Sequence, residues 1–291
     1  MGSNNLILNR LFTRQVINNL VKHNCHDVYA AVIEKYIANM DNYSNREIFR
    51  DIYKYMSENY RNEYFYQNTL LNKLLLGRHS LKTTTALSQV PIERSKADFI
   101  LINGKAVAYE IKTELDTFDR LQTQISDYYK AFNHVCVVTC QDNYAKLSDM
   151  LKDTTVGICV LSKSNTLQFK KEATENNEYL NHSTFFKILR KYEFENVLLE
   201  SVGSLPEATP VFYYDECYKL FKTIPLEQVY KLFLIELKKR NTILDRSYFK
   251  NVPYELKSVI YFSDYFEMNY EKLVAFLNKS YREATGCISH M

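Results

Sequence analysis

Two apolar, β-prone runs separated by Asn103-Gly104 constrain the fold of this chain more than any other feature. An Asn-Gly pair between such runs is a strong short-range signal for a β-hairpin. The first run follows Asp98, and the second ends in Glu110-Ile111-Lys112. Side chains alternate along a strand, so Glu110 and Lys112 are expected on the same face. The pattern predicts that Asp98 opens one strand and that two carboxylates and an ammonium group converge at one end of a sheet.

This cluster of charges has two interpretations. Glu110 sits inside an apolar strand, where an unpaired carboxylate is costly, so Lys112 could simply neutralise it in a structural ion pair. Such a buried pair need not add stability. Alternatively, Asp98 and Glu110 bind Mg²⁺ or Mn²⁺, since these ions take one or two carboxylates together with phosphate and water oxygens. Lys112 would then orient a water molecule and offset phosphate charge. Three charged groups in one hairpin favour the metal site.

A predicted helix over residues 119–132 follows the hairpin and carries polar residues that could complete the site. Gln124 and Tyr128 are four residues apart and therefore share one helix face. They form either a packing pair or a functional pair. Arg120 is either a phosphate contact or a solvated charge. Asp116 is expected to be the helix N-cap or a loop acid. Glu114 is expected on the strand face of Lys112 and is a weaker candidate for a third acid.

Taken together, these residues resemble the PD-(D/E)xK nuclease superfamily, and the local sequence resembles its sce7726 branch of bacterial and phage proteins. The resemblance extends from about Ser80 to Thr139. It is carried by Lys96-Ala97-Asp98, Tyr109-Glu110-Ile111-Lys112-Thr113, Asp116-Thr117, Arg120-Leu121, Gln124 and Tyr128.

The resemblance implies a metal-dependent nuclease that hydrolyses phosphodiester bonds, with DNA as the expected substrate. It implies that Asp98, Glu110 and the carbonyl of Ile111 bind the metal and that Lys112 acts on the attacking water. In RecB-like members, a glutamine and a tyrosine four residues later stand on the following helix, as Gln124 and Tyr128 do here. Lys96 and Arg120 are the expected nucleic-acid contacts. The occurrence of the family in phages and bacteria suggests a role in phage–host conflict or defence.

Three positions depart from the family pattern or leave it open. Gln89 stands where related sequences carry an acid, and it either binds metal through its amide oxygen or marks weakened catalysis. Glu93 is close by and could substitute, although it falls on a predicted turn. Lys96 stands where arginine is common and should still supply a cation.

The upstream acid of the superfamily also has more than one candidate. Glu47 is the first, but Ser44-Asn45-Arg46-Glu47 is equally a capping box, in which Glu47 returns a hydrogen bond to the helix start. Asp51, one turn later, is the alternative.

The order of predicted elements is α-β-β-β-α-β-α-β, as a restriction-endonuclease-like α/β core requires. The expected fold is a mixed sheet flanked by helices, with further helical regions at both ends. The expected regions are an N-terminal helical region (1–43), the nuclease-like core (44–175) and a C-terminal helical region (176–291).

Composition limits the partners. The net charge is only +3, so contact with nucleic acid must come from local patches rather than global basicity. Six cysteines without CxxC spacing predict reduced thiols. With neither a secretory signal nor a long apolar run, a cytoplasmic protein without membrane contact is expected. A homodimer or a protein partner stays open. The alternative function is a weak or inactive nuclease-like module that binds nucleic acid or protein.

Overall fold

The computed structural model describes residues 5–37, 43–240, 246–263 and 267–281. The chain divides into two compact units. The helical unit combines Met1–Leu81 with Thr242–Met291, and the sheet unit is Lys82–Asn241. This division differs from the expected regions in two ways: residues 44–81 lie outside the sheet unit, and the helices after residue 176 are shared between the two units.

The helical unit is built from short helices of both chain ends. Its N-terminal elements are α1 (Leu6–Leu11), α2 (Arg14–His23), α3 (Asp27–Tyr36), α4 (Asn45–Asn59), α5 (Glu63–Leu70) and the π-helix η1 (Leu71–Leu76). Its C-terminal elements are α12 (Arg246–Asn251), the 3-10 helix η2 (Tyr254–Leu256), α13 (Lys257–Tyr261) and α14 (Glu267–Asn278).

Buried polar contacts join the two ends of the chain in the helical unit. The buried Asn45 accepts a hydrogen bond from Tyr29 Oη at 2.6 Å and donates one to the carbonyl of Phe276 at 2.9 Å. Asn68 Oδ1 likewise accepts from the backbone N–H of Ser258 at 2.9 Å. Since buried polar groups are costly unless paired, these contacts make the C-terminal helices part of the N-terminal fold.

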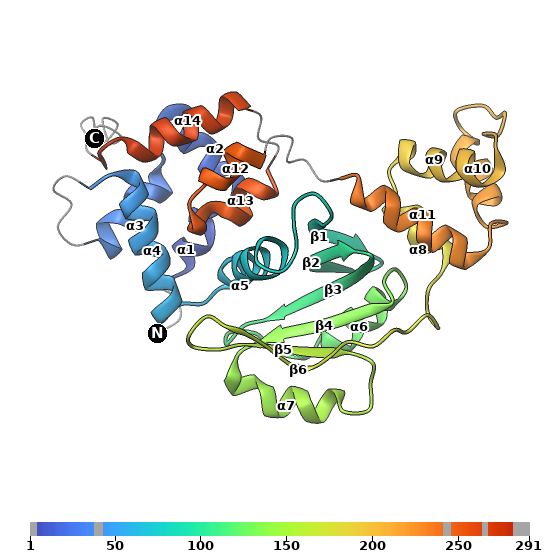
Figure 1. Ribbon diagram of the computed structural model, residues 1–291, viewed down its shortest axis with the longest axis horizontal. Helices are drawn as coiled ribbons and strands as arrows, with labels where there is room; N and C mark the ends of the chain where they lie inside the picture. Colours follow the sequence, from blue (N-terminus) through green and yellow to red (C-terminus); the bar gives the residue numbers. More distant parts are fainter. Residues whose placement is uncertain (1–4, 38–42, 241–245, 264–266, 282–291) are drawn as a thin grey trace. The chain divides into compact units, whose positions relative to one another are not determined.

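A six-stranded mixed sheet forms the centre of the sheet unit (Figure 1). Its strands are β1 (Thr85–Ile92), β2 (Ser95–Asn103), β3 (Lys105–Lys112), β4 (His134–Thr139), β5 (Gly157–Leu161) and β6 (Leu167–Lys171), in that spatial order. Strands β1 to β3 are antiparallel, β3 to β5 are parallel, and β6 returns antiparallel to β5. The hairpin turns at Gly104, whose φ of +73° costs a glycine little.

Helices surround this sheet. They are α6 (Leu121–Tyr129), α7 (Gln141–Leu151), α8 (His182–Ile188), α9 (Lys191–Val202), α10 (Tyr213–Phe221) and α11 (Leu226–Lys238). Helix α6 packs against β2, β3 and β4, while α8 packs against β1 and contacts α10 and α11, which both contact α9. Every residue of β4 is buried, as expected for an apolar strand in the parallel part of a sheet.

The expected α/β class, with a mixed sheet flanked by helices and with helical regions at both ends, is confirmed. The expected succession of strands and helices between residues 64 and 171 is also present. Within the described ranges the cysteines are not joined in disulfides. None of the helices in those ranges is both long enough and apolar enough to cross a membrane.

Candidate functional site

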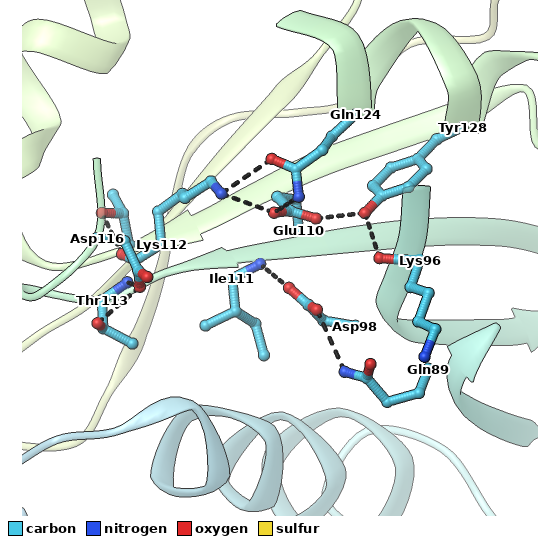
Figure 2. A network of polar contacts seen from close by, with 11 residues as sticks. Gln89, Lys96, Asp98, Glu110, Ile111, Lys112, Thr113, Asp116, Gln124 and Tyr128 are labelled. Carbon is cyan, nitrogen blue, oxygen red and sulfur yellow. Dashed lines mark hydrogen bonds and ion pairs between the residues drawn. The ribbon is translucent and has the colours of Figure 1, made fainter. Parts of the chain in front are cut away.

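Asp98 is the more accessible of the two carboxylates that are expected to bind the metal. It is the fourth residue of β2, so the expectation that it opens the strand was wrong. The register pairs Phe99 with Tyr109, and one further step sets Asp98 opposite Glu110, on the same face. The half-buried carboxylate accepts from the backbone N–H of Ile111 at 2.8 Å and from Gln89 Nε2 at 3.3 Å (Figure 2).

Glu110 and Lys112 form a buried ion pair on one face of β3. Glu110 is 1% exposed and Lys112 7%. Lys112 Nζ lies 2.9 Å from Glu110 Oε1. The expected ion pair therefore exists. It does not exclude a metal, because each carboxylate oxygen has two lone pairs.

Gln124 on α6 binds both members of this pair. Its Oε1 accepts from Lys112 Nζ at 2.9 Å, and its Nε2 donates to Glu110 Oε1 at 2.5 Å. A simple packing role for Gln124 is thus inadequate. The amide has a donor and an acceptor side, and each is matched to the charge that it faces (Figure 2).

Tyr128 completes the cluster from the next turn of α6. Its buried hydroxyl contacts Glu110 Oε2 and, at 2.6 Å, the backbone carbonyl of Lys96. Burial, followed by the charge of Glu110 and the hydrogen bond to it, raises the pKa of Tyr128 far above its ordinary value. The phenol therefore stays protonated and holds Glu110 as a hydrogen-bond donor.

Gln89 and Glu93 have different surroundings. Both have a positive φ of 52°, a conformation uncommon for residues other than glycine. Gln89 is exposed and directs its amide nitrogen to Asp98. Glu93 lies on the turn between β1 and β2, as expected. Its carboxylate accepts from Thr184 Oγ1 at 2.7 Å and lies 3.8 Å from Lys187 Nζ, so it is engaged with α8.

The upstream acids lie in the helical unit. Ser44 donates to Glu47 through its N–H at 2.9 Å and its hydroxyl at 2.7 Å, and Glu47 N–H donates back to Ser44 Oγ at 3.3 Å. The capping-box interpretation of Glu47 therefore holds, and its metal role stays a prediction. The alternative, Asp51, lies 3.4 Å from Arg50 Nε.

Two minor candidates after β3 differ from the expectation. Glu114 lies beyond the end of β3 and is exposed, so its expected place on the strand face was wrong. Asp116 is a loop acid, since it accepts from the N–H and hydroxyl of Thr113 at 2.8 and 2.7 Å. The N-cap of α6 is instead Arg120. The side chains of Arg120 and Lys96 are exposed at the surface.

Sequence reasoning missed a second polar contact between α6 and β2. The buried Asp127 accepts from Ser95 Oγ at 2.9 Å and from Lys130 Nζ at 2.8 Å. Burial opposes ionisation, but these hydrogen bonds lower the pKa of Asp127 overall. No spacing in the sequence marked this contact, because Asp127 is neither three nor four residues from the apolar positions Leu121, Ile125, Tyr128 and Phe132.

Comparison with known proteins identifies the family. Residues 56–260, more than half of the chain, match the family described as Bacteriophage P4 protein cII. The chain belongs to the bacteriophage P4 protein cII family. The matched range of this P4 cII family member contains all six strands and the whole cluster around Glu110. No curated protein and no solved structure matches the chain.

The donor set of this P4 cII family member suits a hard divalent cation. Asp98 and Glu110 offer two carboxylates, which is the number that Mg²⁺ commonly takes from a protein. Gln89 could add an amide oxygen after rotation of its side chain. Within the described ranges no three His, Cys, Asp or Glu residues gather as a metal site. The remaining ligands would therefore be amide or backbone oxygens, water and substrate.

Proposed function

We propose that this chain is a metal-dependent nuclease that hydrolyses phosphodiester bonds in DNA, by the mechanism of the PD-(D/E)xK enzymes that its sequence resembles. The observation that carries the proposal is the closed cluster of Lys112, Gln124, Glu110 and Tyr128 beside Asp98. A structural ion pair alone would not need a glutamine matched to both charges and a tyrosine on the remaining carboxylate oxygen.

Asp98 and Glu110 would hold the cation, with the carbonyl of Ile111 as a further ligand. When bound, Mg²⁺ or Mn²⁺ supplies polarisation of the scissile phosphate and a lowered pKa of the attacking water. Asp98 is held in place by the N–H of Ile111, and Glu110 by Gln124 and Tyr128. Rigid carboxylates of this kind lower the reorganisation needed during the reaction.

With respect to the described residues, Lys112 has one donor left for the substrate. An ammonium group carries three N–H donors, and two of them point to Glu110 Oε1 and Gln124 Oε1, each at 2.9 Å. The third can bind a phosphate oxygen or orient the water. The exposed side chains of Lys96 and Arg120 would contact the phosphate backbone nearby, which positions a strand without reading its sequence.

The test is cleavage of linear duplex, supercoiled plasmid, single-stranded DNA and RNA with Mg²⁺ or Mn²⁺. Wild type is compared with Asp98→Asn and Lys112→Met, and with the exposed control variants Asp153→Asn and Lys163→Met. We expect cleavage that needs the metal, falls at least about 100-fold in both site variants, and persists in the controls. Equal cleavage by site and control variants would reject the site.

Gln124 can be tested with a control on the same helix. Gln124→Ala removes the amide that joins Lys112 to Glu110, whereas Gln122→Ala removes an exposed amide two residues earlier. We expect reduced cleavage only in the first variant.

One observation favours the alternative, a weak or inactive module that binds nucleic acid or protein. Gln89 directs an amide donor at Asp98, and both Asp98 oxygens accept hydrogen bonds. Gln89→Glu separates the two cases. A large gain in metal-dependent cleavage over a barely active wild type would support the alternative, and so would an inactive wild type whose nucleic-acid binding is unchanged by Asp98→Asn.

A further inference from the structure

A second site lies in the sheet unit, at the start of β3 and thus at the opposite end of that strand from Lys112. It is a cavity of about 670 Å³, a size typical of small-molecule sites. Its lining residues come from the β2–β3 turn, the start of β4, the segment after β6 and one face of α11. They include Lys105, His134, Glu175, Leu180, Tyr230 and Lys231.

A buried amide organises the polar side of this cavity. Asn133, 6% exposed, accepts from Tyr230 Oη at 2.7 Å through Oδ1 and donates to Glu175 Oε1 at 2.9 Å through Nδ2. Nδ2 also donates to Asn177 Oδ1 at 3.0 Å. Burial raises the pKa of Tyr230 to about 12, so its hydroxyl remains a donor. The orientation of the amide is therefore determined by its partners.

The same amide determines the tautomer of His134. His134 Nδ1 lies 2.9 Å from Asn133 Oδ1, an atom that can only accept, so Nδ1 carries the proton. Burial and then the charge of Lys105 lower the pKa of His134, which Glu175 opposes. The ring is thus neutral near pH 7, and its Nε2 is an acceptor. Among the described residues, Nε2 has no hydrogen-bond partner.

Glu175 supplies a second hydrogen-bond acceptor in the lining of the same cavity. Its Oε1 accepts from Asn133 and, at 2.9 Å, from Asn177 Nδ2. Within the described ranges no partner contacts Oε2. Glu175 and His134 both line the cavity and both bind the amide of Asn133, so one ligand in the cavity can engage the two acceptors that remain.

Cations and apolar side chains complete the lining. Lys105 is exposed and has no hydrogen bond or ion pair with any described residue, while Lys231 pairs with Glu227 at 2.7 Å. Leu180, Leu226 and Leu234 provide apolar surface. The cavity therefore offers two hydrogen-bond acceptors, an exposed cation and apolar side chains to a ligand.

We propose that this cavity binds a guanine nucleotide. The adjacent N1–H and N2–H donors of guanine match His134 Nε2 and Glu175 Oε2, the leucines contact the faces of the base, and Lys105 binds the phosphate. Adenine fits less well, since its corresponding edge combines a donor with an acceptor and would set the acceptor against an acceptor in the protein. Guanosine lacks the phosphate that Lys105 would bind.

Isothermal titration of the full chain with GMP, AMP and guanosine tests the proposal. We expect saturable binding of GMP and at least about tenfold weaker binding of AMP and of guanosine, as the loss of one charge-assisted hydrogen bond implies. A GMP heat signal that does not saturate up to about 1 mM, or equal affinity for AMP and GMP, would overturn it.

Two variants locate the binding. Glu175→Gln keeps an oxygen for Asn133 but replaces the free acceptor by a donor, and Lys105→Met removes the phosphate contact. Each should weaken GMP binding at least about tenfold, whereas the exposed controls Glu178→Gln and Lys163→Met should not. Unchanged GMP affinity in Lys105→Met and Glu175→Gln would place any binding elsewhere and reject the cavity, and Lys105 is too exposed for its loss to unfold the chain.

One further titration distinguishes a free nucleotide from the end of a strand. A short single-stranded oligonucleotide with a 5′-phosphorylated guanosine is titrated for comparison. Its affinity for the cavity should be no higher than that of GMP. Much tighter binding that Glu175→Gln abolishes would overturn the assignment to a free nucleotide.

Discussion

At the scale of single residues, the carboxylate of Glu110 explains most of the candidate site. Glu110 is 1% exposed, and a carboxylate so deeply buried needs several hydrogen-bond partners in place of the water that it has lost. Lys112 and Gln124 meet one oxygen and Tyr128 meets the other. Removing any one partner therefore leaves an incompletely satisfied buried charge, which is more costly than the loss of an ordinary surface contact.

Lys112→Met should destabilise the sheet unit by about 3–5 kcal/mol, since it leaves Glu110 buried without its counter-charge. The double variant Glu110→Leu/Lys112→Met should be more stable than Lys112→Met alone, because no unpaired charge remains. Urea unfolding followed by circular dichroism measures both. A double variant as unstable as the sum of the two single variants would contradict this view of the pair.

Tyr128 and Tyr129 offer a matched comparison of two buried hydroxyl groups on α6. Tyr128→Phe leaves Glu110 Oε2 without its donor and should cost about 1–3 kcal/mol. Tyr129→Phe breaks a hydrogen bond with the neutral hydroxyl of Thr155 at 2.8 Å and should cost about 1 kcal/mol. Melting temperatures compare the two. Equal losses of melting temperature would mean that the hydrogen bond from Tyr128 to Glu110 contributes no more to stability than the neutral one between Tyr129 and Thr155.

At the scale of elements, an ion pair joins α9 to the end of α11. Arg240 donates to both oxygens of the buried Glu193, at 2.6 and 2.5 Å, and to the carbonyl of Ile188 at 2.8 Å. Glu193 also accepts from the N–H of Arg190 at 2.7 Å, at the start of α9. One carboxylate thus connects the first turn of α9 to a residue just beyond the C-cap of α11.

This contact predicts a loss of stability in acid. Burial opposes the charge of Glu193, but the hydrogen bonds from Arg240 and Arg190 lower its pKa below the ordinary 4.5. A carboxyl group with a lowered pKa in the folded state stabilises above its unfolded value, and that stability is lost as the pH falls through the folded value. The sheet unit should therefore weaken as the pH falls below about 4.5.

Melting curves recorded from pH 7 down to about 3 test this expectation. Glu193→Gln should lower the melting temperature near neutral pH and flatten its decline in acid. Glu200→Gln, an exposed carboxylate on the same helix, should leave the profile unchanged. A Glu193→Gln profile parallel to that of wild type would remove Glu193 as the cause.

At the scale of the whole molecule, the sheet unit is a continuous segment, whereas the helical unit needs both ends of the chain. The segment Lys82–Asn241 contains the sheet, its helices, the Glu110 cluster and the cavity beside His134. Nothing in the chemistry described for the sheet unit uses a side chain of the helical unit.

Residues 82–241 expressed alone should therefore fold cooperatively, with one sharp melting transition and native-like near-ultraviolet circular dichroism. The helical unit without residues 242–291 should not, because Asn45 and Asn68 would lose their C-terminal partners. A segment 82–241 that lacks a cooperative transition would show that the sheet unit depends on the rest of the chain.

The sequence by itself determined the local structure and much of the candidate site. Strand alternation set Glu110 and Lys112 on one face, helix periodicity set Gln124 and Tyr128 on another, and Asn103-Gly104 gave the hairpin. Each of these features depends on residues that are close together in the chain. They can therefore be predicted from the order of polar and apolar residues. The same local signal identified the capping box of Glu47.

Only the tertiary structure decided which distant residues meet. It brought the Lys96 carbonyl to Tyr128, Ser95 to Asp127 and Thr184 to Glu93, and it joined the two chain ends into one unit. It also built the cavity wall around Asn133 from segments 97 residues apart. Such contacts form because elements that are distant in the sequence pack into one core. Hydrophobic periodicity predicts each element, but it does not predict which elements pack against each other.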